Sequence, residues 1–132
     1  MECGLFLSCE ETYIGASPDG LVTCGPDNNP YLIEVKCPYR WRNASVMQAC
    51  KDKDFCCYVD TNNNIQLKTN HRYYTQVQGQ MGVCNKENCD FVIYTVTDFV
   101  IIKVDFDKLF WDKLLQQLKE FYFSAIVPKL CT

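Results

Sequence analysis

Short runs of apolar residues, several of them alternating with polar ones, predict a chain rich in short strands. Strand character is found at 5–8, 13–17, 21–24, 31–36, 55–59, 65–67, 91–96 and 99–104. Polar turn segments separate 21–24 from 31–36 and 55–59 from 65–67, so each of these pairs is predicted to form a hairpin. The Thr97-Asp98 step between the last two strands has the spacing of a two-residue hairpin turn.

Helical periodicity marks the C-terminal part of the chain. The segment 105–123 repeats apolar residues at helical spacing, and Pro128 is expected to end whatever helix follows. We expect that apolar stripe to lie in the core; it consists of Leu109, Trp111, Leu114, Leu115, Leu118, Phe121 and Tyr122. A short helix over 46–51 is also predicted, with Ser45 as its N-cap.

The predicted helix over 72–83 has two distinct faces. Thr75, Gly79 and Gly82 form a small face that would allow close approach to a sheet. Tyr73, Gln76 and Gln80 share another face, whereas Gln78 points elsewhere by the helical repeat. Strands and helices together predict an α/β protein with a mixed sheet and packed helices, although the pattern alone fits several α+β folds.

Length and composition predict one intracellular domain over residues 1–132. The chain has 48% hydrophobic and 22% charged residues, an ordinary soluble balance. It has no apolar run long enough to cross a membrane and no secretory signal, so we expect a cytoplasmic or nuclear protein. The net charge is −3, but residues 34–72 carry seven Lys and Arg against four Asp and Glu. This basic segment fits either a phosphate-holding surface or a solvated loop.

The ten cysteines favour reduced thiols over a disulfide scaffold, because the strands and helices can build a core unaided. Cys37 is expected to be a small buried hydrophobe. A zinc site remains an alternative, because four thiolates would suffice. Its ligands would be Cys50, Cys56 or Cys57, Cys84 and Cys89.

The candidate chemistry lies in the hairpin formed by 21–24 and 31–36. Side chains alternate along a strand, so Glu34 and Lys36 share one face while Ile33 and Val35 are expected to point into a core. The hairpin can bring Asp19 beside Glu34. Two carboxylates and a main-chain carbonyl make a hard oxygen site suited to Mg²⁺ or Mn²⁺. A nearby lysine can orient a water or stabilise charge on a phosphate.

Three blocks at these positions resemble the restriction-endonuclease-like nucleases, and most closely the YqaJ or lambda-exonuclease family. The blocks are Ser17-Pro18-Asp19-Gly20-Leu21, Glu34-Val35-Lys36-Cys37-Pro38 and Tyr73-Tyr74-Thr75-Gln76-Val77-Gln78, and the resemblance covers roughly 13–128. It implies a mixed β-sheet flanked by α-helices. It also implies that Asp19, Glu34 and the Val35 carbonyl bind the metal, that Lys36 is catalytic, and that Gln76 is the helix glutamine near the metal-bound water.

The resemblance further implies a Mg²⁺- or Mn²⁺-dependent DNA nuclease that degrades double-stranded ends from 5′ to 3′, with a role in recombination or DNA processing. Relatives form rings around DNA, so a homo-oligomer is a possible state. We expect Ser17, Arg40, Arg42 and Tyr73 to contact the DNA. The run Tyr39-Arg40-Trp41-Arg42 fits either a grip on the nucleic acid or a loop with its aromatic rings packed on the core.

One departure from the family leaves a second function open. The family has a helical region before the first block, with a further acidic metal-site residue, whereas twelve residues precede Tyr13 here. Glu10 or Glu11 would substitute, or the site has lost a ligand, or the chain is a fragment. The alternative function is a catalytically impaired nuclease fold that acts as a DNA-binding or protein-interaction module.

Overall fold

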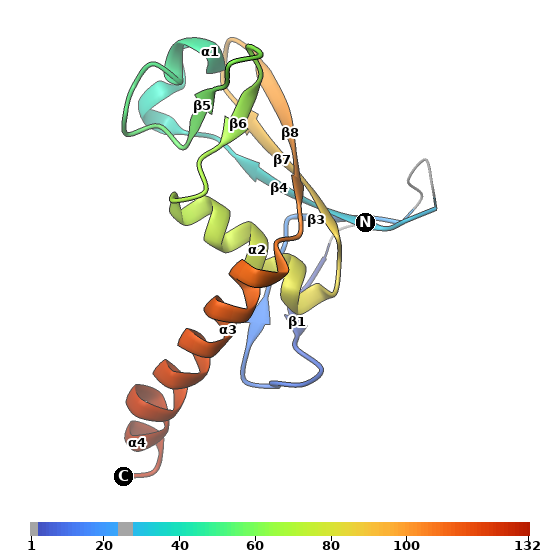
Figure 1. The fold of residues 1–132 in the computed structure, drawn as a ribbon, viewed down its shortest axis with the longest axis vertical. Helices are drawn as coiled ribbons and strands as arrows, with labels where there is room; N and C mark the ends of the chain where they lie inside the picture. The colour runs from blue at the N-terminus through green and yellow to red at the C-terminus, as the bar shows by residue number, and fades with distance from the viewer. Residues whose placement is uncertain (1–2, 24–27) are drawn as a thin grey trace.

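A four-stranded mixed sheet is the centre of the computed structural model, which describes residues 3–23 and 28–132 (Figure 1). The strand order is β3-β4-β7-β8. These strands are β3 (Gly20–Val22), β4 (Tyr31–Lys36), β7 (Asn88–Tyr94) and β8 (Phe99–Asp105). β4 and β7 are parallel and the two outer pairs are antiparallel. The predicted α/β class and the β3–β4 hairpin are therefore confirmed.

Two smaller hairpins and a short helix accompany the sheet. β1 (Phe6–Leu7) pairs with β2 (Gly15–Ala16), and β5 (Cys57–Val59) pairs with β6 (Ile65–Leu67), both antiparallel. A 3₁₀ turn, η1, spans Tyr39–Trp41, and α1 spans Val46–Ala49. Ser45 caps α1 as predicted, in a reciprocal capping box with Gln48.

Helix α2 (Arg72–Cys84) contributes to the core on one face of the sheet. Leu32 and Glu34 of β4 are buried on that face, together with Val77 and Met81 of α2. The prediction that Ile33 and Val35 point into the core was therefore wrong, since Val35 is 40% exposed. Strand alternation was predicted correctly, but which face is covered depends on where the helix packs.

The opposite face of the sheet is open to solvent at several apolar positions. Register places Val35, Val92 and Ile101 in one row and Tyr94 opposite Phe99 in the next. Tyr94, Phe99 and Ile101 are 54%, 62% and 52% exposed.

The connection between β7 and β8 is longer than predicted. Tyr94 pairs with Phe99, so Thr95–Asp98 form a four-residue turn and the expected two-residue turn was wrong. The Thr95 amide donates to the Asp98 carbonyl at 2.8 Å, and the Thr95 hydroxyl also bonds Asp98. The Asp98 carboxylate in turn accepts from the Val46 amide at 3.1 Å, which ties this turn to α1.

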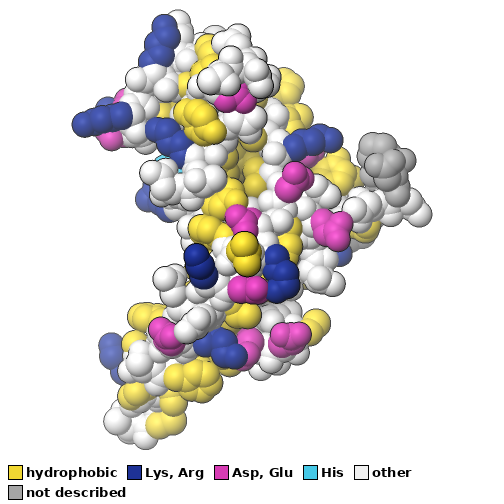
Figure 2. Space-filling model, viewed as in Figure 1, with side chains coloured by type: hydrophobic (Ala, Val, Ile, Leu, Met, Phe, Trp, Pro, Cys, Tyr) yellow, Lys and Arg dark blue, Asp and Glu magenta, His cyan; other side chains and the backbone are white. Residues whose placement is uncertain are grey.

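The C-terminal helix is more exposed than its apolar stripe predicted. α3 (Lys108–Phe121) is followed by a π-helical turn, Tyr122–Ile126, and by α4 (Val127–Leu130). Trp111 is buried as expected, but Leu109 and Phe121 are 77% and 59% exposed, so their assignment to the core was wrong. For Phe121 the reason is that the second half of α3 runs beyond the sheet and α2 (Figure 1), where Figure 2 shows hydrophobic side chains on its surface.

Pro128 does not end the helix as predicted. It lies in the first turn of α4, where a missing backbone N–H is tolerated, and the helix continues to Leu130. No helix among the described residues combines the length and apolar character needed to cross a bilayer.

The small face of α2 packs against α3 and not against the sheet, contrary to the prediction. A Cβ at Gly82 would lie 2.4 Å from two carbons of the Trp111 indole. A Cβ at Gly79 would meet its nearest neighbour, Leu114, at an ordinary 3.7 Å. Glycine at position 82 therefore provides the space in which the indole ring sits.

Candidate active site

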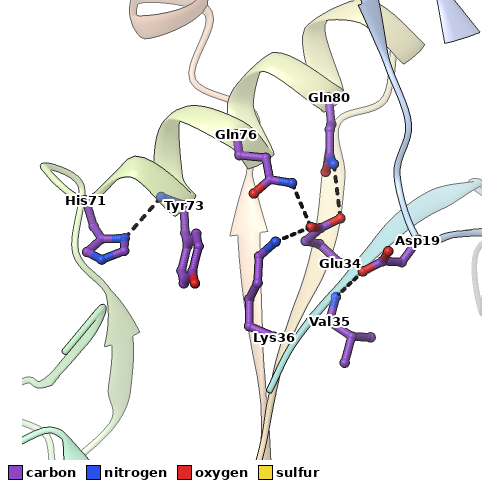
Figure 3. A network of polar contacts seen from close by, with 8 residues as sticks. All are labelled: Asp19, Glu34, Val35, Lys36, His71, Tyr73, Gln76 and Gln80. Atoms are coloured by element: carbon purple, nitrogen blue, oxygen red, sulfur yellow. Dashed lines mark hydrogen bonds and ion pairs between the residues drawn. The ribbon is translucent and has the colours of Figure 1, made fainter. Parts of the chain in front are cut away.

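The β3–β4 hairpin brings the two candidate metal-binding carboxylates together. Gly20 pairs with Ile33, so one step further along the ladder Asp19 lies opposite Glu34. Opposed residues of an antiparallel pair project to the same face. Asp19 Oδ2 accepts a hydrogen bond from the Val35 amide at 2.8 Å. Figure 3 shows the Asp19 carboxylate on one side of Glu34 and the Lys36 ammonium on the other.

Glu34 is buried, with 3% of its surface exposed, and three donors converge on it. Oε1 accepts from Lys36 Nζ at 2.5 Å and from Gln76 Nε2 at 2.8 Å. Oε2 accepts from Gln80 Nε2 at 3.0 Å. A buried carboxylate is costly unless it is paired and hydrogen-bonded, and these three contacts supply that compensation.

Lys36 lies between Glu34 and an aromatic ring. Its ammonium is 4.8 Å from the centre of the Tyr73 ring, a cation–π contact, and its side chain is 19% exposed. Tyr73 was expected to contact DNA, but here it packs against Lys36 and tilts toward Phe91, with ring centres 6.0 Å apart. The Lys36 ammonium is therefore held between Glu34 and Tyr73, while part of its side chain stays accessible to solvent.

Helix α2 positions the polar side chains that reach Glu34 from above the sheet in Figure 3. Gln76 and Gln80 are one helical turn apart on one face, as predicted, and Gln78 points away. The helix begins at His71, whose Nδ1 accepts from the Tyr73 amide at 3.1 Å. Burial, followed by the charges of Arg72 and Lys68, lowers the pKa of His71 and so favours the neutral ring that this cap requires.

The oxygen donors at this site fit a hard divalent cation. They are the carboxylates of Asp19 and Glu34, with no thiolate or imidazole among them. The Val35 carbonyl stays the third predicted donor, and the Val35 amide contacts Asp19. Within residues 3–23 and 28–132, no three His, Cys, Asp or Glu side chains gather closely enough to hold a metal on their own. The four-thiolate zinc alternative was therefore wrong. Cys37, expected to be buried, is exposed because it follows Lys36 in the alternation of the strand.

Glu11 is engaged elsewhere and does not join the carboxylate pair. It forms an ion pair with Lys119 at 2.5 Å and accepts from the Tyr13 hydroxyl at 2.6 Å. Tyr13 also stacks on Tyr122, with ring centres 4.0 Å apart. Glu10 is exposed. The expectation that Glu11 replaces a missing metal ligand was wrong, because the loop that carries it packs on α3.

The two candidate DNA-contacting arginines have different surroundings. Arg40 forms ion pairs with Asp52 and Asp54 at 3.2 and 3.3 Å. The guanidinium of Arg42 lies 3.9 Å from the centre of the Tyr39 ring and donates to the Tyr39 carbonyl at 2.8 Å. Tyr39 is 76% exposed.

The run 39–42 therefore has one aromatic ring packed on the core and an arginine with a tyrosine left on the surface, so it combines features of both predictions for it. Trp41 packs edge-on against Phe55 at 5.0 Å and donates from its indole nitrogen to Asp52 at 3.1 Å. Tyr39 and Arg42 remain on the surface. Ser17, the remaining candidate for DNA contact, is exposed and lines a groove of about 300 Å³ together with Thr75 and Gln76.

Comparison with known proteins identifies the family. Residues 1–87 match the model of the YqaJ-like viral recombinase domain. The chain belongs to this family. No curated protein matches the chain significantly.

Two crystal structures of the alkaline exonuclease LHK-Exo from Laribacter hongkongensis resemble this member of the YqaJ-like family. The structure in complex with dAMP has a TM-score of 0.66 at 26% identity, covering 92% of this chain and 53% of that one. The second has a TM-score of 0.57 at 26% identity, covering 98% of this chain and 63% of that one. The chain thus spans between half and two thirds of the length of these relatives. The restriction-endonuclease-like fold is confirmed.

Sequence reasoning gave Gln80 no role in the site. The i, i+4 spacing from Gln76 placed the two amides side by side, but it could not show that both reach the same carboxylate.

Proposed function

We propose that this YqaJ-like domain is a metal-dependent DNA nuclease that hydrolyses phosphodiester bonds, acting from 5′ to 3′ on double-stranded ends. The observation that carries the proposal is the convergence of Asp19, Glu34 and Lys36 on one face of the β3–β4 hairpin. Membership of the recombinase family supports it, as does the likeness to an alkaline exonuclease. Polarity and preference for duplex ends are inferred from the family resemblance.

The residues divide the work as follows. Asp19, Glu34 and the Val35 carbonyl would hold Mg²⁺ or Mn²⁺, which when bound polarises a phosphate oxygen and lowers the pKa of a water. Lys36 keeps its ammonium beside Glu34 and would orient the attacking water or stabilise charge on the phosphate. Gln76, on the exposed side of α2, holds the Glu34 oxygen that Lys36 also contacts.

DNA is the expected partner, and backbone contacts suffice for a nuclease that ignores sequence. The stacked Arg42–Tyr39 pair offers a phosphate contact and an aromatic face for a base on the same surface. Assembly of several copies around DNA stays a prediction from the resemblance.

The test is digestion of end-labelled linear duplex DNA with and without Mg²⁺ or Mn²⁺. Wild type should digest the DNA only with the cation, and a 5′ label should be released before a 3′ label. Asp19→Asn, Glu34→Gln and Lys36→Met should each lower the rate at least 100-fold, because each removes a group that acts on the cation or the phosphate. Lys103→Met, on the exposed side of β8, is the matched control and should retain full activity.

Two outcomes would contradict the proposal. Equal digestion by wild type and all three site variants would assign the activity to a contaminant. Wild type that binds duplex DNA without cutting it, under any divalent cation, would favour the binding module instead.

A further inference from the structure

The side chain of Gln80 is buried against Glu34. Its Nε2 donates a hydrogen bond to Glu34, whereas its Oε1 accepts none from the described residues. We propose that Gln80 is a positioning residue that fixes the orientation of the Glu34 carboxylate for the cation. This inference rests on the metal site proposed above and assigns a role to a side chain that touches neither metal nor DNA.

The contact geometry separates the two glutamines on Glu34. Gln80 is 4% exposed, and in the described part of the chain its Nε2 is the one side-chain donor to Oε2. Gln76 is exposed and shares Oε1 with the Lys36 ammonium. Water can replace Gln76, and Lys36 remains on the same oxygen. Oε2 is buried with Gln80, so no such replacement is at hand for it.

The second observation concerns the other end of the same amide. Gln80 Oε1 is buried and has no hydrogen-bond partner within residues 3–23 and 28–132. An unpaired buried acceptor lowers the stability of the folded state, and an apolar side chain of similar size would avoid that loss. That cost offsets part of the stabilisation that the amide gives by satisfying the buried Glu34. The donor presented to Oε2 is therefore the contact that accounts for an amide at position 80.

Fixing Oε2 matters because a cation is bound along the lone pairs of the carboxylate oxygens. A carboxylate held at both oxygens keeps its plane, so the lone pairs that no donor occupies keep a fixed direction for a cation. Without Gln80, the carboxylate is held at Oε1 alone and can rotate. Loss of a group that holds a metal ligand in place typically lowers metal affinity 10- to 100-fold.

The experiment compares Gln80→Met with Gln116→Met, which removes an exposed glutamine of α3 that contacts Glu120 and not the site. Mn²⁺ affinity is measured by calorimetry and by the electron paramagnetic resonance of the free ion, and thermal denaturation is followed without metal. Gln80→Met should bind Mn²⁺ about 10- to 100-fold more weakly. The metal-free protein should still denature in one cooperative transition, at a lower midpoint because Oε2 has lost its donor. Gln116→Met should leave the affinity for Mn²⁺ unchanged.

A second variant, Gln80→Asn, keeps the amide but is one methylene too short to reach Oε2, and it should lose affinity to the same extent as Gln80→Met. Equal Mn²⁺ affinity in wild type and both folded variants would overturn the inference alone and leave the proposed nuclease standing. Failure of both variants to fold would assign Gln80 to the fold and also overturn it. Wild type that binds no Mn²⁺ would remove the metal site and the inference together.

Discussion

At the scale of the residue, neighbours in sequence have different tasks because their contacts differ. Arg40 and Arg42 both belong to the basic segment, yet Arg40 is held by Asp52 and Asp54 whereas Arg42 stacks on Tyr39. Part of the positive charge near the site is therefore neutralised locally. Fewer positive charges are therefore available to a phosphate than the number of Lys and Arg residues in this segment indicates.

Arg42 should matter more for DNA binding than Arg40. We expect Arg42→Gln to weaken duplex DNA binding several-fold and to reduce the slope of log affinity against log salt by about 1, because one phosphate contact is lost. Arg40→Gln should change the slope by less, since its charge is already paired. Fluorescence anisotropy at a series of salt concentrations, with Ca²⁺ in place of Mg²⁺, measures both. A larger loss for Arg40→Gln would contradict the assignment.

Strand and helix periods predicted which of these residues share a face, and packing decided what that face meets. Glu34 with Lys36, and Gln76 with Gln80, followed from local geometry alone. The burial of Glu34 and the exposure of Val35 did not follow, because the covered face of the sheet is set by α2. The pairing of Glu11 with Lys119 joins opposite ends of the chain, and no local pattern in the sequence marks it.

At the scale of the element, α2 makes contacts on two sides. One side contacts Glu34 at the candidate site, and another side contacts α3. Gln78 donates to the Asp105 carbonyl at 2.9 Å and accepts from the Asp107 amide at 2.8 Å. Tyr74 donates to the Asp107 carboxylate at 3.3 Å. Asp107 is the N-cap of α3, so these contacts fix the start of α3 relative to α2. The small residues of α2 then allow the two helices to approach.

Gly82→Ala should destabilise the protein although alanine is the better helix former. The new Cβ would lie 2.4–2.8 Å from three carbons of Trp111, so the indole must shift, and overpacking of this kind costs about 1–3 kcal/mol. Gly79→Ala is the matched control: its Cβ has room, so the free energy of unfolding should stay or rise by up to about 1 kcal/mol.

Urea denaturation of the two variants checks this prediction. A smaller loss for Gly82→Ala in a Trp111→Leu background would locate the strain at the indole. Equal stability of Gly79→Ala and Gly82→Ala would contradict the prediction. The sequence marked these glycines as a packing face but not the partner of that face, because both a helix and a sheet accept a small surface.

At the scale of the whole molecule, contacts between distant segments connect the first hairpin to the last long helix. Glu11 pairs with Lys119, and Tyr13 stacks on Tyr122 and meets Phe123 edge-on at 5.6 Å. The resemblance to the recombinase family predicted the sheet and the two strands that carry the candidate site. It did not predict this connection, nor the exposure of the helix beyond it, because both depend on segments outside the three matched blocks.

This connection should weaken in acid. Hydrogen bonds from Lys119 and Tyr13 lower the pKa of Glu11, so its contribution to stability is present above the ordinary carboxyl pKa and is lost as pH falls through the lowered one. The same bond to Glu11 raises the pKa of Tyr13 to about 12, so the hydroxyl stays a donor throughout this range. Wild type should therefore melt above Glu11→Gln near neutral pH, and the gap should close toward pH ~3.

Thermal melts of wild type and Glu11→Gln between pH ~3 and pH ~8 measure the gap across the range where a carboxyl group titrates. Glu10→Gln is the control, because Glu10 is exposed and should leave the profile unchanged. A gap that persists undiminished at the acid end would show that the ion pair is not its source.

The division of α2 into sides has a consequence for how the protein tolerates change. One side of the helix contacts Glu34 through Gln76 and Gln80, another contacts α3 and its N-cap segment through Gln78 and Gly82, and a third fills the core. Most positions along α2 therefore contact Glu34, α3 or the core, so a substitution in this helix is expected to have more than one effect. We expect the protein to tolerate substitutions on the open face of the sheet and along the end of α3, and to tolerate few in α2.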